Sequence, residues 1–128
     1  MFVPHHQHLL VKARCNKPIT EVEKLNNWFT ELVHKVGMEV VAGPTSVYVG
    51  EPGNEGLTGT VTLATSHASI HIWELSEPAM FQFDIYSCKK YELQTVIDHL
   101  NKMDLISYEW MMIERNEGLK VVAEGTNG

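Results

Sequence analysis

The chain has 128 residues, of which 44% are hydrophobic and 20% charged; this composition supports one globular domain over residues 1–128 and excludes a disordered chain. Its formal net charge of −6 argues against nucleic acid as a partner, because that binding depends on clustered Lys and Arg. No apolar run reaches the roughly 20 residues that cross a bilayer, and residues 1–6 lack the features of a secretion signal. We therefore expect a cytoplasmic protein with no membrane partner.

The first strand and the first helix are predicted near the N-terminus. Residues 9–15 form a β-prone run. Thr20 and Glu23 have the spacing of a capping box, in which the two side chains satisfy free backbone N–H groups at a helix start. Apolar residues then recur at helical spacing, which predicts a helix over about residues 20–36.

The next region mixes short β-prone pieces with loop signals. Residues 38–41 and 46–49 favour strands, but Gly43-Pro44 separates them. Residues 50–59 are rich in Gly, Pro, Asn and Glu, so they are expected to form an exposed loop that can act as a lid.

The second half of the chain predicts four strands in total and one more helix, then a polar end. Short links between the first three strands imply antiparallel neighbours. Apolar residues at helical spacing predict the helix. In chain order, the expected segments are strands over residues 60–63, 68–73 and 80–86, a helix over 93–103, a strand over 107–113 and a polar tail over about 117–128.

The resulting order, β-α-β-β-β-β-α-β, predicts the class of fold. Two helices cover only one face of such a sheet, which gives an α+β two-layer sandwich with a mostly antiparallel sheet. The other face must be solvated or covered by a partner. A homodimer is therefore expected.

The stretch over residues 65–71 carries the most chemically able side chains of the chain. On a strand, alternation projects His67, Ser69, His71 and Trp73 to one face and small apolar residues to the other. The sequence therefore predicts a half-buried strand with a polar, histidine-rich face.

Metal binding is not expected from the sequence. The histidines at positions 5, 6 and 8 precede a strand without a second ligand cluster at fixed spacing, so solvated or strand-edge histidines are the favoured interpretation. Cys15 and Cys88 lack CxxC spacing and are expected to be reduced thiols.

Three segments in order resemble the bacterial and archaeal S-adenosylmethionine decarboxylase proenzymes, which are pyruvoyl-dependent. They are Gly56-Leu57-Thr58-Gly59, Thr65-Ser66-His67-Ala68-Ser69-Ile70-His71-Ile72-Trp73-Glu74 and Asp84-Ile85-Tyr86-Ser87-Cys88. The strand and helix pattern around them also fits that family, so the resemblance covers most of the chain.

The resemblance implies self-cleavage between Thr65 and Ser66. Attack by the Ser66 hydroxyl on the Thr65 carbonyl, followed by β-elimination, leaves a pyruvoyl cofactor at position 66. That group forms a Schiff base with the substrate amine and withdraws electrons as carbon dioxide leaves. By the same resemblance, Thr58 and His71 assist processing, and Cys88 is the acid that reprotonates the substrate carbon.

The substrate implied by the resemblance is S-adenosylmethionine, with amino acids such as arginine or ornithine as related possibilities. In the family, a glutamate four residues after the histidine holds the substrate ribose. Here Leu75 takes that offset, and Glu74 and Glu77 lie on either side. Glu74, Glu77 and His67 are therefore the candidate substrate-binding residues.

Two further functions stay open from sequence. Thr65 stands where the family has glutamate, and Glu74 is displaced, which favours a non-processing relative that binds a small ligand or acts as a dimeric regulator. A hydrolase using Ser66 or Cys88 is less favoured, because the sequence lacks a Gly-x-Ser-x-Gly nucleophile elbow.

Overall fold

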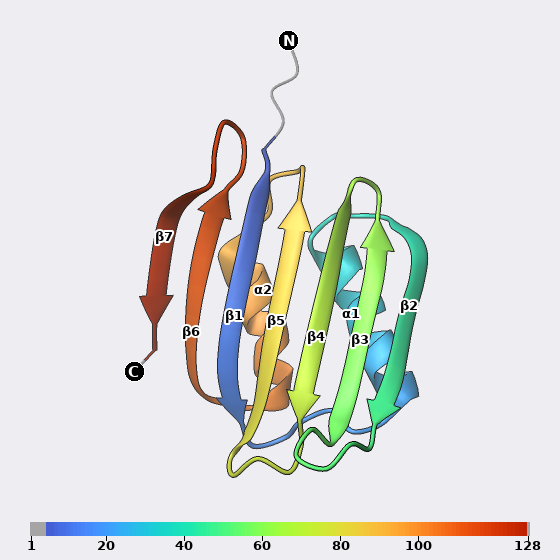
Figure 1. The fold of residues 1–128 in the computed structure, drawn as a ribbon. Coiled ribbons are helices and arrows are strands. Elements are labelled where there is room, and N and C mark those ends of the chain that lie inside the picture. The colour runs from blue at the N-terminus through green and yellow to red at the C-terminus, as the bar shows by residue number, and fades with distance from the viewer. Residues whose placement is uncertain (1–4, 128) are drawn as a thin grey trace.

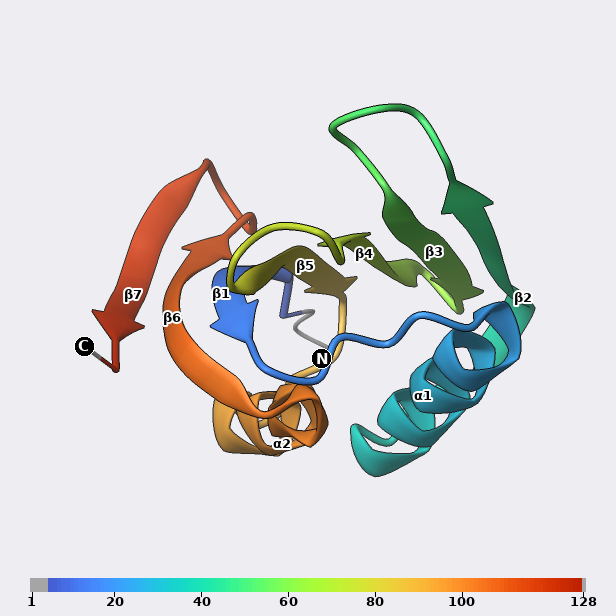
Figure 2. The same ribbon diagram turned by 90° about the horizontal axis from the view of Figure 1, so that it is seen from below.

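A computed structural model describes residues 5–127 and shows an antiparallel sheet of seven strands with two α-helices on one face (Figures 1 and 2). This confirms the predicted α+β two-layer sandwich. Residues 1–4 and 128 lie outside the described part. Most of residues 1–6, where no secretion signal is expected, therefore lies outside it too. Across residues 5–127, no helix has the length and apolar character that spanning a membrane requires.

The strands follow the spatial order β2-β3-β4-β5-β1-β6-β7. Each predicted strand and helix has a counterpart in the structure. Their bounds are β1 (Gln7–Cys15), α1 (Val22–Lys35), β2 (Val40–Val49), β3 (Gly56–Leu63), β4 (Ser66–Trp73), β5 (Ala79–Ser87), α2 (Leu93–Leu100), the 3-10 turn η1 (Asn101–Met103), β6 (Leu105–Glu114) and β7 (Lys120–Thr126).

The hydrophobic core lies between the sheet and the helices. In each central strand every second residue is buried, as with Ala68, Ile70 and Ile72 in β4, because alternate side chains of a strand point to opposite faces. Fully burying one such large apolar side chain contributes roughly 1.5–3 kcal/mol. The core therefore fixes the register, and with it the residues that lie on the helix-free face.

Both helices differ slightly from their predictions. Helix α1 begins at Val22, with Glu21 as its N-cap, and no side chain of the described residues caps it. The predicted capping box of Thr20 and Glu23 is therefore wrong, because Glu21 rather than Thr20 occupies the cap position. Helix α2 ends at Leu100, and residues 101–103 continue as a 3-10 turn.

The region predicted as two strand pieces and a loop is more regular than expected. β2 is one strand with register shifts on either side of Ala42; it tolerates Pro44 because an edge strand does not need every ladder donor. The predicted loop over residues 50–59 is too long, because β3 already begins at Gly56. Gly56 has φ +148°, and a Cβ there would lie 1.8 Å from the carbonyl oxygen of Ile72, so only glycine allows this close approach.

Most of the expected polar tail, residues 120–126, forms a strand instead. β7 pairs with β6 in an antiparallel hairpin at the edge of the sheet. Nearly all its side chains are exposed, including Val121 and Val122. Since β7 buries almost nothing, its sequence carries no amphipathic signal, and backbone pairing alone defines it.

A buried histidine joins the two helices. His99 in α2 is 1% exposed; its Nε2 atom donates to the Trp28 carbonyl oxygen at 2.8 Å, and Lys35 Nζ lies 3.2 Å from its Nδ1 atom. A lysine can only donate, so Nδ1 is the acceptor and the ring is neutral. Burial, together with the charge of Lys35, lowers the pKa of His99.

This lowered pKa predicts that the fold weakens in mild acid. Below the unfolded-state value of 6.5, the unfolded chain binds a proton that the folded chain rejects, so the free energy of unfolding falls with pH until the folded-state pKa is reached. Urea denaturation at a series of pH values measures this. The same series on His99→Gln isolates the contribution, and equal slopes for the two proteins would contradict it.

Candidate active site

The bond between Thr65 and Ser66 lies in the tight β3–β4 turn, at the upper edge of the sheet in Figure 1. Thr65 has φ +60°, a left-handed conformation that a β-branched residue rarely adopts. Ser66 begins β4 and is 8% exposed, and its Oγ atom accepts a hydrogen bond of 3.3 Å from the backbone N–H of Cys88. The turn is therefore both strained and anchored.

Cys88 follows β5 and lies beside this turn. Its Sγ atom contacts Oγ1 of Thr65, and its side chain is half-buried. The structure thus brings together Thr65, Ser66 and Cys88, three of the residues named in the sequence analysis. Cys15 differs, because burial and the charge of Asp104 raise the pKa of its thiol to about 11, which leaves it unreactive.

The strain at Thr65 is measurable. Thr65→Gly is expected to raise the free energy of unfolding by about 1 kcal/mol, because glycine adopts positive φ without a steric penalty. Urea denaturation in a Ser66→Ala background, which cannot cleave, measures this. The matched control Thr62→Gly, in the extended part of β3, is expected to lower the same quantity by about 0.5–1 kcal/mol; two losses of equal size would refute the strain.

Thr58 and His71 form a second pair at a distance from the turn. They are register partners in β3 and β4, and Thr58 Oγ1 lies 3.2 Å from His71 Nδ1. His71 follows Ser66 by five residues of extended strand, which separates their Cα atoms by about 17 Å. Within one chain, the structure therefore does not bring these two residues to the Thr65–Ser66 bond.

The acidic candidates lie at the His71 end of the sheet. Glu74 is half-buried and accepts a hydrogen bond of 2.7 Å from the Tyr48 hydroxyl, which raises the pKa of that phenol. Glu77 is exposed in the β4–β5 connection. Arg14 holds this connection by donating to Ser76 Oγ at 2.7 Å. Neither glutamate lies near Ser66 in the same chain.

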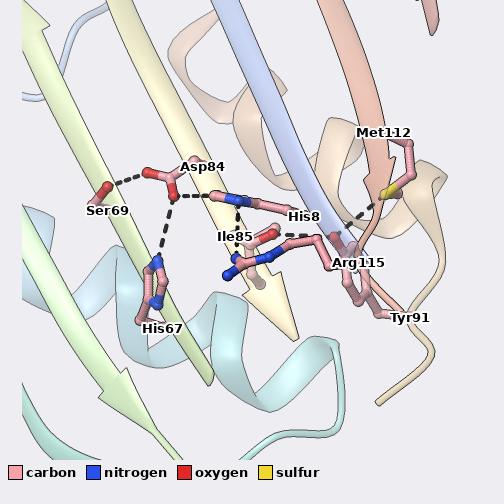
Figure 3. Close-up of polar contacts among 8 residues, drawn as sticks. All are labelled: His8, His67, Ser69, Asp84, Ile85, Tyr91, Met112 and Arg115. Atoms are coloured by element: carbon pink, nitrogen blue, oxygen red, sulfur yellow. Dashed lines mark hydrogen bonds and ion pairs between the residues drawn. The ribbon is translucent and has the colours of Figure 1, made fainter. Parts of the chain in front are cut away.

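On the helix-free face, His67 belongs to a cluster that sequence reasoning missed (Figure 3). His8 Nε2 lies 2.7 Å and His67 Nε2 3.5 Å from the same oxygen, Oδ2 of Asp84, while Ser69 donates to Asp84 Oδ1. Burial alone raises the pKa of the Asp84 carboxyl, but the hydrogen bonds from His8 and Ser69 and the two histidine charges outweigh it and hold that pKa below its ordinary value.

Tyr86 joins this cluster to the N-terminal histidines. It is the register partner of both His8 and His67. Its hydroxyl lies 2.7 Å from His6 Nδ1, and the Arg115 guanidinium lies 4.2 Å above its ring. The signal available in the sequence was alternation in the strand over residues 80–86, where polar Asp84 and Tyr86 interrupt apolar neighbours.

A cavity of about 760 Å³ opens on the same face. In Figure 2 the β2–β3 and β6–β7 hairpins rise on either side of this face. The lining mixes apolar side chains with about as many polar ones, and such concave sites are where small molecules bind. It includes Leu10, His71, Gln82, Asp84, Glu109 and Met111.

The fold and the site together define a class of protein: an α+β sandwich with a buried serine in a strained turn, beside a cysteine, at the edge of a polar sheet face. The sequence pattern of the S-adenosylmethionine decarboxylase family matches residues 7–115. The chain therefore belongs to the S-adenosylmethionine decarboxylase family. Strand β7 follows the matched residues.

A curated relative agrees with this family assignment. The S-adenosylmethionine decarboxylase proenzyme of Pyrococcus abyssi (strain GE5 / Orsay) is 29% identical over 97 residues. The match covers 74% of this chain and 66% of the relative, so the chain spans just under two thirds of that protein.

Proposed function

We propose that the chain is a pyruvoyl-dependent decarboxylase that cleaves itself between Thr65 and Ser66 and acts on S-adenosylmethionine or a related amino acid. The observation that carries the proposal is the placement of Ser66. Its hydroxyl lies in a turn with a left-handed residue on the carbonyl side and Cys88 alongside. A serine at this place fits a cofactor made from the chain itself.

Cleavage uses atoms of residues 65 and 66 and consumes one water molecule. Ser66 Oγ attacks the Thr65 carbonyl carbon, the C–N bond breaks, and the new amine takes the hydroxyl proton, giving an ester. Loss of the Ser66 α-proton then expels the Thr65 carboxylate, and water releases ammonia from the remaining residue. The strain at Thr65, of order 1–3 kcal/mol, is released in the first step.

After cleavage, the pyruvoyl group supplies an electron sink for the carboxylate carbon that is lost. The residues around it bind the substrate and move protons. Cys88 lies beside Ser66 and Thr65, which supports a role for its thiol in returning a proton to the substrate carbon. His67, on the open face, and the nearby cavity that Asp84 lines are the part of the chain that would bind the rest of the substrate.

The role of His71 requires a second copy of the chain. Thr58 and His71 lie about 17 Å along the strand from Ser66, so they reach a Thr65–Ser66 bond only across an interface. The helix-free face offers such an interface, since it exposes apolar Leu10 and Met111. A homodimer that joins two of these faces head to tail supplies Thr58 and His71 from the partner.

The test is the mass of the freshly purified chain together with carbon dioxide release. Cleavage predicts fragments of residues 1–65 and 66–128, the second beginning with a pyruvoyl group. Release of carbon dioxide from S-adenosylmethionine, arginine or ornithine then identifies the substrate. A single 14.5 kDa species without decarboxylation would contradict the proposal.

The open-face cavity also favours the alternative, a non-processing relative that binds a small ligand. Its lining mixes apolar and polar side chains, and Glu74 is already bonded to Tyr48. This alternative predicts an intact chain whose melting temperature rises with the ligand, because a ligand that binds only the folded state stabilises it.

A further inference from the structure

We propose that His8, His67 and Asp84 form a binding site for one divalent transition-metal ion of the zinc type. The sequence gives no hint of such a site, because the three residues come from strands that are distant in the chain. The proposal goes beyond the decarboxylase function: it concerns neither the Thr65–Ser66 bond nor Cys88, although it shares His67 with the proposed substrate site.

The spacing of the three ligand atoms fits a tetrahedral ion. Zinc binds histidine nitrogen and carboxylate oxygen at about 2.0–2.1 Å, so the ligand atoms of a tetrahedron lie roughly 3.3 Å apart. The two distances from Asp84 Oδ2, 2.7 Å to His8 Nε2 and 3.5 Å to His67 Nε2, lie on either side of this value. All three ligand atoms lie within 4.8 Å of one another, so small rotations of the side chains complete the geometry.

The backbone holds these side chains in place before an ion arrives. β5 lies between β1 and β4, and Tyr86 of β5 is the register partner of His8 on one side and His67 on the other. Asp84 lies two residues earlier on the same face, so its carboxylate reaches both rings (Figure 3). Ligands on neighbouring strands of a rigid sheet lose little freedom on binding.

Asp84 also has the outer support that metal ligands require. Ser69 donates to Oδ1, which leaves Oδ2 directed at the two histidines. Hydrogen bonds of this kind orient a ligand, and their loss typically lowers metal affinity 10–100-fold. His67 is 50% exposed in the single chain, which leaves a fourth ligand position for water.

The ligand types select the ion. Two imidazoles and one carboxylate suit Zn²⁺, Co²⁺ and Ni²⁺, whereas Mg²⁺ requires oxygen ligands in octahedral geometry. One neighbour opposes binding: Arg115 Nη1 lies 3.5 Å from His8 Nδ1, and that nitrogen must carry a proton when neutral His8 binds metal through Nε2. Arg115 is exposed, so it can turn away from His8.

The experiment measures metal affinity on the metal-free chain and on its Ser66→Ala variant, so that cleavage does not influence the result. We expect one Zn²⁺ per chain, an intense visible spectrum of tetrahedral Co²⁺, and no competition from Mg²⁺. His67→Ala is expected to weaken Zn²⁺ binding at least tenfold. The matched control His34→Ala, an exposed histidine at the end of α1, is expected to leave it unchanged.

Arg115→Gln separates a metal site from a simple ion pair. Removing the opposing charge is expected to tighten Zn²⁺ binding by about two- to fivefold, the effect of an exposed charge. Equal Zn²⁺ affinity of the wild-type and His67→Ala chains, with unchanged melting temperatures, would place any bound ion elsewhere and overturn the proposal. So would a folded Ser66→Ala chain that binds no Zn²⁺, because Asp84 would then only balance the charge of the histidines.

Discussion

Replacing Ser66 by alanine is expected to leave a single uncut chain of 14.5 kDa and to abolish decarboxylation. The methyl group has no oxygen to attack the Thr65 carbonyl, so neither the ester nor the pyruvoyl group forms. Ser66 is 8% exposed and starts a strand, so the small alanine side chain fits without rearrangement. Intact-mass measurement before and after incubation, with carbon dioxide release from candidate substrates, reads both effects.

The control is a serine that no step uses. Ser107 is exposed on β6, and Ser107→Ala is expected to be cut and active like the wild type. Cleavage in the Ser66→Ala chain at the same bond would show that an external protease acts on the exposed turn. A wild-type chain that stays intact in the same experiment would favour the ligand-binding alternative.

The sequence was sufficient for the fold wherever a side-chain pattern reflects burial. The alternation of residues 66–73 correctly separates the buried face of β4 from the face with His67 and His71. β7 was missed because its side chains are almost all exposed, and pairing by backbone hydrogen bonds leaves no pattern of side chains. Because two helices cover only one face of the sheet, the sequence also predicts a face without helices. The expectation that a partner covers this face has the same basis.

The candidate site was predictable only in part, because a motif gives order and not distance. The motif named Cys88 and Thr65, but only the structure shows that the two side chains are in contact. The separation of His71 from Ser66 was already implied by the rise of a strand, about 3.3 Å for each residue. The cluster around Asp84 required the sheet order, since the β1–β5 pairing joins residues about 76 positions apart and no local pattern reports it.

The separation of Ser66 from His71 leads to a sharper test of the homodimer. If His71 acts on the Ser66 of its own chain, a chain that carries Ser66→Ala cannot help a chain that carries His71→Ala. If His71 acts across an interface, a mixed dimer contains one complete site, formed by Ser66 of the His71→Ala chain and His71 of the Ser66→Ala chain. The two arrangements therefore predict opposite results from the same pair of variants.

Each variant alone is expected to remain uncut, because every dimer of identical chains lacks one member of both sites. When the two are produced together in equal amounts, about half of the dimers of a two-fold symmetric protein are mixed, so about half of the His71→Ala chains are expected to be cleaved. Mass spectrometry distinguishes the two chains and identifies which one is cut. As a control, the His71→Ala chain is produced together with a Ser66→Ala, His71→Ala double variant. No cleavage of the His71→Ala chain is expected in that mixture. Absence of cleavage in the mixture, with mixed dimers present, would contradict action of His71 across an interface and would support the arrangement in which His71 acts on the Ser66 of its own chain.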